Sequence, residues 1–405
     1  MQGYLLTHIK EECFGCGACY QICPKDAISM NCDEEGFRYP FIKEDVCIHC
    51  DKCRNICPVN SSNVKNNDEQ MAWGGYHKNS SVREQSTSGG AFTAICEEWM
   101  KDEAFIIGAE MITPTRIEHS MISNLEELSR LRKSKYLQSD TGRTYQKTKE
   151  LLKAQKKVLY SGTPCQIAGL RSYLGSEFDN PNLLTVEVVC EGVPTPIFTE
   201  RYIAYLEKRF KKKVQCIDWR DKNNSKWDFQ FTRVTFEDSK EYKLSRWFNP
   251  FWSIWLKHLM SRPSCYICPF TTKERVADIT IADLWGVHLY CPELYGNNGG
   301  SSLVVCNTQR GKDTWGLASV RMFGHTLDLD EAIKYQSPMR KCIDNNPDRE
   351  EFIKDLKELD YNTLCKKWAT KPTLRLLFQK YVYGNRQKVA LWKLKKLLTQ
   401  GGDKK

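Results

Sequence analysis

Apolar runs and helical periodicity alternate along the chain after residue 70. Residues 103–111, 158–160 and 183–189 are short apolar runs, which are typical of strands buried in a sheet. Apolar residues recur with helical spacing over 92–99 and 167–174. This alternation predicts an α/β domain, and in such domains the loops that follow the strands commonly hold the ligand.

The same pattern predicts several smaller features. Ser88 precedes the helical pattern at 92–99 and is expected to be its N-cap. Residues 214–248 indicate shorter strands joined by turns, and residues 250–260 indicate an aromatic helix. Residues 61–70 are polar and aperiodic, so we expect a linker there.

Composition narrows the class of protein. The chain has 405 residues, of which 41% are hydrophobic, and no apolar run approaches the roughly 18 residues of a spanning helix. The first residues lack a basic segment followed by an apolar one, so we expect no signal peptide and a cytoplasmic location. In a reducing compartment the 19 cysteines are better explained by metal ligation than by disulfides.

The positive charge is concentrated at the C-terminus. The net charge is +10, but residues 366–405 contain twelve Lys or Arg and one Asp, a balance of +11, which leaves about −1 for the rest. Nucleic-acid binding by the whole protein is therefore not indicated. The pattern of residues 387–398 predicts an amphipathic helix. Such a helix suits docking on the body, binding of an acidic partner, or peripheral contact with the inner face of a membrane.

Two cysteine runs dominate the N-terminal part. Both have the spacing C-x2-C-x2-C-x3-C-P, and the second repeats the first 34 residues later. In such runs the fourth cysteine ligates the other cluster, which predicts two 4Fe–4S clusters. The pattern resembles the bacterial two-cluster ferredoxin domain, and this resemblance implies an α+β ferredoxin-like domain at residues 1–62. Structural zinc would leave one cysteine of each run without a role. The ligand sets are Cys13, Cys16, Cys19 and Cys57 for one cluster, and Cys47, Cys50, Cys53 and Cys23 for the other. Cys32, between the runs, is expected to be a packed thiol.

Six segments beyond this domain resemble one family. They are residues 86–90 (STSGG), 132–140 (RKSKYLQSD), 161–166 (SGTPCQ), 189–194 (VCEGVP), 265–269 (CYICP) and 277–286 (ADITIADLWG). In this order they are similar to the coenzyme F420 hydrogenase/dehydrogenase beta-subunit family, over roughly residues 70 to 310. The resemblance implies an α/β flavin-binding domain, placed at 71–365, with bound FAD and at least one further 4Fe–4S cluster. Residues 366–405 form the basic tail.

The resemblance places four cysteines at this third cluster: Cys165, Cys190, Cys265 and Cys268. Cys165 and Cys190 follow predicted strands, and Cys265 and Cys268 form a CxxC pair, so all four offer soft ligands. The alternative is that the first two are structural thiols and the pair is incidental or binds zinc. The remaining cysteines, Cys96, Cys216, Cys291, Cys306, Cys342 and Cys365, show no ligand spacing and are expected in the core.

The resemblance also indicates the flavin contacts. A glycine-rich helix N-terminus suits a pyrophosphate, because its free N–H groups and helix dipole face the anion. Lys135 is expected to pair with a phosphate or with the polar edge of the flavin, although RLRKSK could also be a surface basic run. His119 and His288 are candidates only because histidine as a residue type titrates near neutral pH, and neither is assigned a catalytic role. The expected contacts are Ser88, Gly89, Gly90, Lys135, Tyr136, Gln138, Ser139, Gly162 and Thr163.

These features predict an iron–sulfur flavoprotein oxidoreductase that passes electrons between 4Fe–4S clusters and FAD to reduce or oxidise a small organic substrate. A redox partner protein is expected as donor or acceptor. Two alternatives stay open. The chain could use the deazaflavin coenzyme F420, or it could be a non-catalytic electron-transfer subunit of a larger complex.

Overall fold

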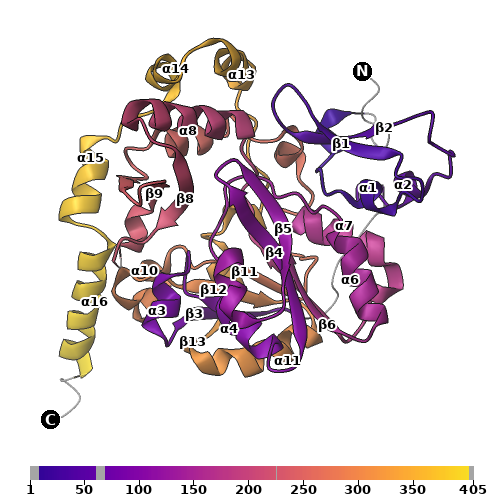
Figure 1. The fold of residues 1–405 in the computed structure, drawn as a ribbon. Helices are drawn as coiled ribbons and strands as arrows, with labels where there is room; N and C mark the ends of the chain where they lie inside the picture. Colours follow the sequence, from indigo (N-terminus) through magenta and orange to yellow (C-terminus); the bar gives the residue numbers. More distant parts are fainter. Residues whose placement is uncertain (1–8, 61–68, 225, 401–405) are drawn as a thin grey trace.

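The computed structural model describes residues 9–60, 69–224 and 226–400 (Figure 1). Most of the predicted linker, residues 61–68, lies outside the described residues, as do the extreme ends of the chain. The described part is a mixed α/β structure built on one eight-stranded sheet, with a three-stranded sheet and a two-stranded sheet beside it. The α/β prediction for the body is therefore confirmed at the level of a large mixed sheet.

The N-terminal cysteine runs fold as two similar loop–helix units. β1 (Ile28–Cys32) and β2 (Arg38–Ile42) pair antiparallel, and the short helices α1 (Ala18–Ile22) and α2 (Lys52–Asn55) lie below them in Figure 1. The repeat extends to the backbone, because residues 34 apart share left-handed conformations: Gly15 and His49 have φ of 64° and 50°, and Gly17 and Asp51 have φ of 80° and 54°.

The two loops differ in their surroundings, and this explains their different residues. A Cβ on Gly17 would lie 2.6 Å from Thr141 Oγ1, and one on Gly15 would lie 3.0 Å from the Arg262 guanidinium. The first loop is therefore pressed against the body and requires glycine. His49 and Asp51 are exposed, so side chains are accommodated at the same φ in the second loop.

The large sheet has the order β13-β3-β12-β11-β7-β6-β4-β5. Its central strands β4, β6, β7 and β11 run parallel, while the outer pairs are antiparallel. The central positions are fully buried, as the apolar runs in the sequence predict. The strands are β3 (Met71–His77), β4 (Ala104–Thr113), β5 (Arg116–Ile122), β6 (Lys157–Gly162), β7 (Leu183–Val188), β11 (Ile279–Asp283), β12 (Ser302–Cys306) and β13 (Met322–Leu327).

Helices connect and cover these strands. The connections are α3 (Ser80–Glu84), α4 (Ala91–Trp99), α5 (Leu128–Leu131), α6 (Thr144–Lys153), α7 (Pro164–Leu174), α10 (Val287–Tyr290), α11 (Gln309–Ala318) and α12 (Leu329–Ile333). One expectation fails here. The N-cap of α4 is Gly90 and not Ser88, because the Ser88 hydroxyl donates to the Ser301 carbonyl at 2.5 Å.

The part of the chain between β7 and β11 forms a second layer. It holds α8 (Pro196–Phe210), the antiparallel strands β8 (Val214–Asp221), β9 (Phe231–Phe236) and β10 (Glu241–Ser245), and α9 (Pro250–Trp255). Its core is aromatic, with Trp219 and Phe251 rings 4.1 Å apart. α13 (Arg349–Glu358) and α14 (Tyr361–Trp368) pack against the same core. The short strands and the aromatic helix agree with the sequence pattern.

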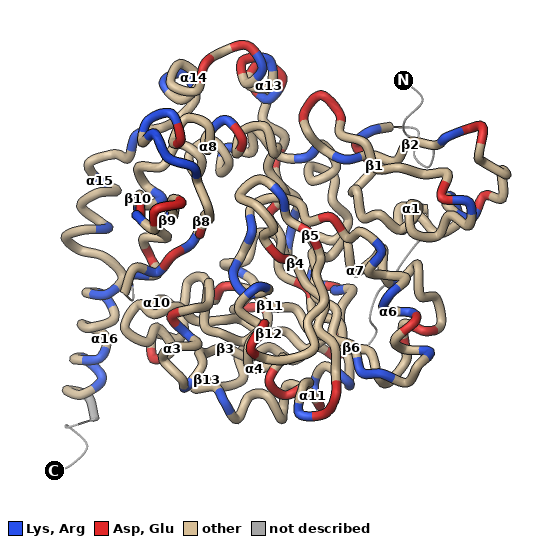
Figure 2. The backbone as a smooth tube through the Cα atoms, viewed as in Figure 1, with Lys and Arg blue, Asp and Glu red and all other residues tan. Residues whose placement is uncertain are grey.

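The C-terminal residues run along one side of the body. α15 (Leu374–Leu377) and α16 (Asn385–Gln400) follow α14, and Val389 of α16 is buried in a cluster with α10. Figure 2 shows blue segments along α16, which contains no acidic residue. Among the described helices, none combines the length and the apolar character that crossing a membrane requires.

The cysteines outside the predicted ligand sets divide into three groups by burial, and Cys342 and Cys365 form the intermediate group. Cys96, Cys291 and Cys306 are buried, as expected of core residues. Cys32 and Cys216 are exposed, so their expected burial is wrong. Cys32 is the last residue of β1 and follows the exposed Asn31, and Cys216 follows the exposed Gln215 near the start of β8, so both thiols lie at exposed strand ends.

Candidate redox site

The four thiols assigned to the first cluster line one cavity. Cys13, Cys16 and Cys19 come from the first loop, and Cys57 reaches them from the end of the second run. Among the described residues, no acidic or histidine side chain lines this cavity, so its donor set consists of sulfur alone. Burial raises the pKa of the Cys16 and Cys19 thiols, which makes their thiolates costly unless a cationic centre compensates. A 4Fe–4S cluster fits this donor set.

The second set lines a separate cavity. Cys47, Cys50 and Cys53 come from the second loop, and Cys23 crosses over from the first run. Main-chain N–H groups face the sulfurs, with Ala27 N 3.3 Å from Cys23 Sγ and His49 N 3.4 Å from Cys47 Sγ. Cys50 is exposed, and the neighbouring Ile48 is 54% exposed. This cavity therefore lies at the molecular surface, whereas the first lies against the body.

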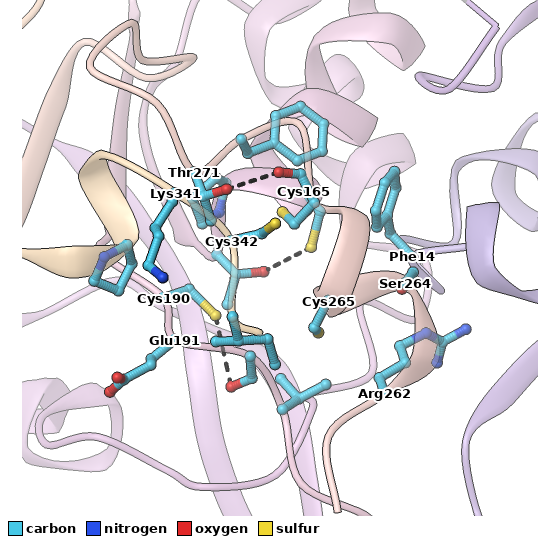
Figure 3. A pocket seen from close by; sticks show the side chains of 18 of the residues that line it. Phe14, Cys165, Cys190, Glu191, Arg262, Ser264, Cys265, Thr271, Lys341 and Cys342 are labelled. Carbon is cyan, nitrogen blue, oxygen red and sulfur yellow. Dashed lines mark hydrogen bonds between the residues drawn. The ribbon is translucent and has the colours of Figure 1, made fainter. Parts of the chain in front are cut away.

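The four body cysteines also meet at one cavity, shown in Figure 3. Cys165 lies in the first turn of α7, Cys190 follows β7, and Cys265 and Cys268 lie at a short helical turn. Thr163 Oγ1 is 3.2 Å from Cys165 Sγ, and the Cys190 thiol donates to the Gly192 carbonyl at 3.8 Å. Burial raises the pKa of Cys265 to about 11. Loops from distant parts of the chain thus bring together four soft ligands, which fit a cluster.

A fifth cysteine lines this third cavity. Cys342 belongs to the segment between a turn at 337–339 and α13, and its thiol was expected in the core. No local spacing reveals it, because its cysteine neighbours in the cavity lie at least 74 residues away (342 − 268). Within 9–60, 69–224 and 226–400, no three His, Cys, Asp or Glu side chains are close enough to hold a single metal ion. The thiol sets are therefore spaced more widely than the ligands of one ion.

The first and third cavities share a wall. Phe14, between two cysteines of the first loop, lines both cavities and packs edge-on against Phe270 with ring centres 5.4 Å apart. The Gln138 side chain donates to the Phe14 carbonyl at 2.7 Å, which fixes the loop to the body. A Cβ on Gly169 of α7 would lie 3.0 Å from Cys16 Sγ, so the loop lies directly on this helix.

The third cavity in turn adjoins a large pocket of about 530 Å³. Thr163, Cys190 and Glu191 line both spaces. The volume lies within the range of roughly 300–1,000 Å³ that is usual for cofactor sites. All of the expected flavin contacts line this pocket except Gly89. Gly89 lies behind the wall, where its N–H donates to Ser302 Oγ at 2.9 Å.

One end of the pocket suits an anion. The N-terminus of α4 points its unpaired first-turn N–H groups there, beside Thr87 and Ser88. Arg132 also lines the pocket, and its guanidinium donates to the neutral side chains of Thr93 and Gln85, at 3.0 and 2.9 Å. Its charge is therefore available to a phosphate, and sequence reasoning assigned this role to Lys135 instead.

Lys135 is placed differently from the expectation. Its ammonium donates to the carbonyls of Leu131 and Arg132, at 3.0 and 2.6 Å, at the C-terminal end of α5. Burial lowers its pKa to about 7. The lysine is thus half-buried and satisfied by the main chain, which makes it neither a surface residue nor a ready phosphate ligand.

The other expected contacts form the middle of the pocket. Ser139 is buried and hydrogen-bonds His119 Nδ1 at 3.0 Å, while His119 Nε2 lies 2.9 Å from the Ser161 carbonyl. Nε2 must donate to that carbonyl, which leaves Nδ1 to accept from Ser139 in a neutral ring, and burial lowers the pKa of His119 to about 4. Tyr136 packs among aromatic rings, with Trp252 at 4.8 Å.

Charged groups lie opposite the anion end. Arg220 pairs with Asp283 through two hydrogen bonds, of which Nη2 to Oδ1 is 3.1 Å. Arg246 donates to Gln230 Oε1 at 2.7 Å, and its buried Nε has no hydrogen-bond partner among the described residues. Asp278, by contrast, is buried under the sheet, where it accepts hydrogen bonds from Thr185, away from the pocket. His288 does not line the pocket either.

Two family models match parts of the chain. Residues 12–61 match the model of the 4Fe-4S dicluster domain, and residues 155–330 match the model of the C terminus of the coenzyme F420 hydrogenase/dehydrogenase beta subunit. The second match begins after residues 86–140, so the flavin contacts in that segment rest on the pocket and not on this model. No curated protein matches the chain significantly.

Among solved structures, a chain of the F420-reducing nickel–iron hydrogenase complex from Methanosarcina barkeri is similar. It is 16% identical with a TM-score of 0.42, and the match covers 73% of this chain and 90% of that one. Behind its N-terminal 4Fe-4S dicluster domain, the chain thus matches the coenzyme F420 hydrogenase/dehydrogenase beta-subunit family over residues 155–330, as the sequence motifs predict.

Proposed function

We propose that this protein is an iron–sulfur flavoprotein oxidoreductase that passes electrons between a protein partner and a small organic substrate. The observation that carries the proposal is the sequence of adjoining sites. Phe14 is common to the first and third cavities, and Cys190 is common to the third cavity and the large pocket. The first and third sulfur-lined cavities and the cofactor-sized pocket thus form a continuous series, and the second cavity lies within the same N-terminal domain as the first.

The thiols divide into three sets of four. Cys13, Cys16, Cys19 and Cys57 would hold the first cluster, Cys23, Cys47, Cys50 and Cys53 the second, and Cys165, Cys190, Cys265 and Cys268 the third. Bound clusters supply one-electron carriers, and FAD supplies exchange between one-electron and two-electron chemistry. Cys16 and Cys19 are buried and the other thiols of the first and third sites are partly buried, which limits their contact with water.

The large pocket supports FAD. The α4 N-terminus and Arg132 would hold the pyrophosphate. Gly162 and Thr163 line the wall near the third cavity, where the ring would be closest to Cys190. The neutral His119 holds Ser139 in place on the same wall.

The metal and flavin content of protein purified without oxygen tests this proposal. We expect about twelve irons and one FAD per chain. A Cys190→Ser and Cys265→Ser double variant should retain about eight irons. Cys216→Ser, at an exposed thiol, is the matched control and should retain all of the iron. About eight irons in the wild-type protein, with no flavin, would instead favour a non-catalytic electron-transfer subunit.

A second candidate substrate comes from the family name, which makes deazaflavin coenzyme F420 the alternative to an ordinary metabolite. Mixing the oxidised holoprotein with reduced coenzyme separates the two. Rapid bleaching of the bound flavin supports the deazaflavin, and an unchanged flavin spectrum supports another substrate.

We also propose that α16 brings the chain to an anionic membrane surface. Leu391, Leu394 and Leu398 are exposed, with Leu398 at 69%, whereas Val389 of the same helix is docked on the body. Helical periodicity places basic residues on both flanks of this stripe, which suits an interfacial helix. The flanking residues are Arg386, Lys388, Lys393 and Lys395.

Vesicle flotation tests the membrane proposal. The wild-type protein should float with vesicles that contain anionic lipid and not with neutral ones. A Leu394→Glu and Leu398→Glu variant should stay at the bottom. The control, Leu317→Glu with Val320→Glu, changes two similarly exposed apolar residues outside the tail and should float. Equal flotation of both variants would contradict the proposal.

A further inference from the structure

Arg262 is a buried cation that spans two of the cysteine sites. It lies three residues before Cys265, and its side chain is only 1% exposed. Its Nε donates to the Cys13 carbonyl at 2.9 Å, and its Nη2 lies 3.9 Å from Cys13 Sγ. The same side chain lines the third cavity. One guanidinium therefore touches the loop of the first site and the wall of the third.

The hydrogen-bond partners of Arg262 are neutral groups. Nη1 donates to Gln138 Oε1 at 3.1 Å, and Nη2 donates to the Arg38 carbonyl at 3.0 Å. The Tyr39 ring lies 4.2 Å from the guanidinium carbon. These contacts hold the group against the first loop, where Gly15 leaves the necessary space.

Among the described residues, two other arginines are buried, and each has a carboxylate partner. Arg275, which also lines the third cavity, pairs with Glu187, and Arg220 pairs with Asp283. Across the described residues, no carboxylate oxygen lies within the 4 Å ion-pair distance of Arg262. A buried charge without a counter-charge is strongly unfavourable, so the compensating negative charge must come from another source.

The thiol sites supply that negative charge. A 4Fe–4S cluster held by four thiolates is anionic, and reduction by one electron makes it more so. Arg262 also lines the third cavity together with Cys165 and Cys265, so its charge faces the third site as well as the first. The cation is thus placed to favour negative charge on both sides.

We propose that Arg262 is the shared counter-cation of the first and third clusters and raises the reduction potential of both. The inference rests on the proposed function, because it requires clusters at these two thiol sets. Each reduction adds one electron from the redox partner and no proton, and the fixed positive charge stabilises the added negative charge. Arg262 acts as a positioning residue whose effect is electrostatic.

Potentiometric titration followed by electron paramagnetic resonance tests the proposal on the full-length holoprotein. In Arg262→Gln the first and third clusters should shift to lower potential by at least about 59 mV, a tenfold change for a one-electron couple. The second cluster, held by Cys23, Cys47, Cys50 and Cys53, should not move and serves as an internal reference. Arg262→Lys keeps the charge and should retain most of the wild-type potentials.

A matched control separates this effect from a change in net charge. Arg233→Gln removes one arginine charge from β9, where three carboxylates surround it, and should leave all three potentials unchanged. Unchanged potentials in Arg262→Gln, or equal shifts of all three clusters, would overturn the proposal. Loss of iron from the Gln variant but not the Lys variant would support it, and loss from both would overturn it, because the loops would then need the shape of the side chain and not its charge.

A failure of the proposed function would be recognised by a different measurement, the iron content. A wild-type protein with about eight irons would remove the third cluster. The potential of the first cluster in Arg262→Gln would still decide whether Arg262 is its counter-cation.

Discussion

We predict that the buried ion pair of Glu187 and Arg275 is important for the stability of the fold. Glu187 on β7 is fully buried and Arg275 is 1% exposed at the side chain. Arg275 also donates to the Phe270 and Thr272 carbonyls at 2.8 and 3.1 Å, in the segment that follows Cys268. The pair therefore links the central sheet to the wall of the third cavity.

Removing one partner of the pair should lower the free energy of unfolding much more than removing both. Glu187→Gln leaves the Arg275 charge buried and unpaired, which typically costs about 3–5 kcal/mol. At about 2 °C per kcal/mol for a large chain, the thermal midpoint should fall by roughly 6–10 °C. The Glu187→Met and Arg275→Met double variant should lose less than either single variant, because it leaves no buried charge.

Thermal unfolding of the wild-type protein and these variants, at one scan rate and with matched iron content, measures this difference. The control is Glu118→Gln, which breaks an exposed pair with Arg116 and should cost only about 0–1 kcal/mol. If Glu187→Gln unfolded at the wild-type temperature, or if the single losses simply added in the double variant, the electrostatic account of this pair would be refuted.

Three further predictions follow from individual contacts. Gly17→Ala should lower the iron content, because the left-handed φ alone costs about 1–2 kcal/mol and the new Cβ clashes with Thr141. Asp51→Ala, at the equivalent position of the second loop, should retain its cluster. Iron assay and thermal unfolding compare the two variants. Burial lowers the pKa of Lys135 in the folded state to about 7, so the unfolded chain binds more protons than the folded chain between about pH 7 and 10. The free energy of unfolding should therefore rise with pH in that window. Lys135→Met should flatten this rise, whereas the control Lys149→Met should not. Cys342→Ser should keep about twelve irons, and a loss of four would make Cys342 a ligand in place of one of the assigned thiols.

The sequence alone predicts the N-terminal sites well because their ligands are local. Each run holds three cysteines within one loop, and the proline after the fourth cysteine signals its diversion to the other site. The cavities in the structure group Cys57 with the first run and Cys23 with the second, as that rule expects. The central strands β4, β6 and β7 are also readable, because they coincide with the apolar runs at 103–111, 158–160 and 183–189. The edge strand β5, with the sequence RIEHSMI, has no such run, so the pattern does not predict it.

The residues proposed to contact the flavin are harder to predict from the sequence, because their placement depends on one backbone angle. Lys133 has a φ of 69°, which turns the chain at the end of α5 and returns Lys135 to the carbonyls of that helix. Arg132, before the turn, is directed to the pocket instead. Composition cannot indicate which cation of a run such as RLRKSK faces the ligand. In the same way, Arg262 and Cys13 are 249 residues apart, and no pattern connects them.

The two cysteine loops of the N-terminal part share one backbone conformation but have different surroundings. This difference changes how favourable added negative charge is at each site. The first loop is buried against α7 and touched by Arg262, while the second loop presents Cys50 and Ile48 to solvent. Burial disfavours added negative charge, whereas a neighbouring cation favours it, so the two effects oppose each other at the first site and are both weak at the second. Identical ligand spacing can thus give two different potentials. Under the proposed function, the exposed site would exchange electrons with a partner and the buried site would pass them toward the third cavity.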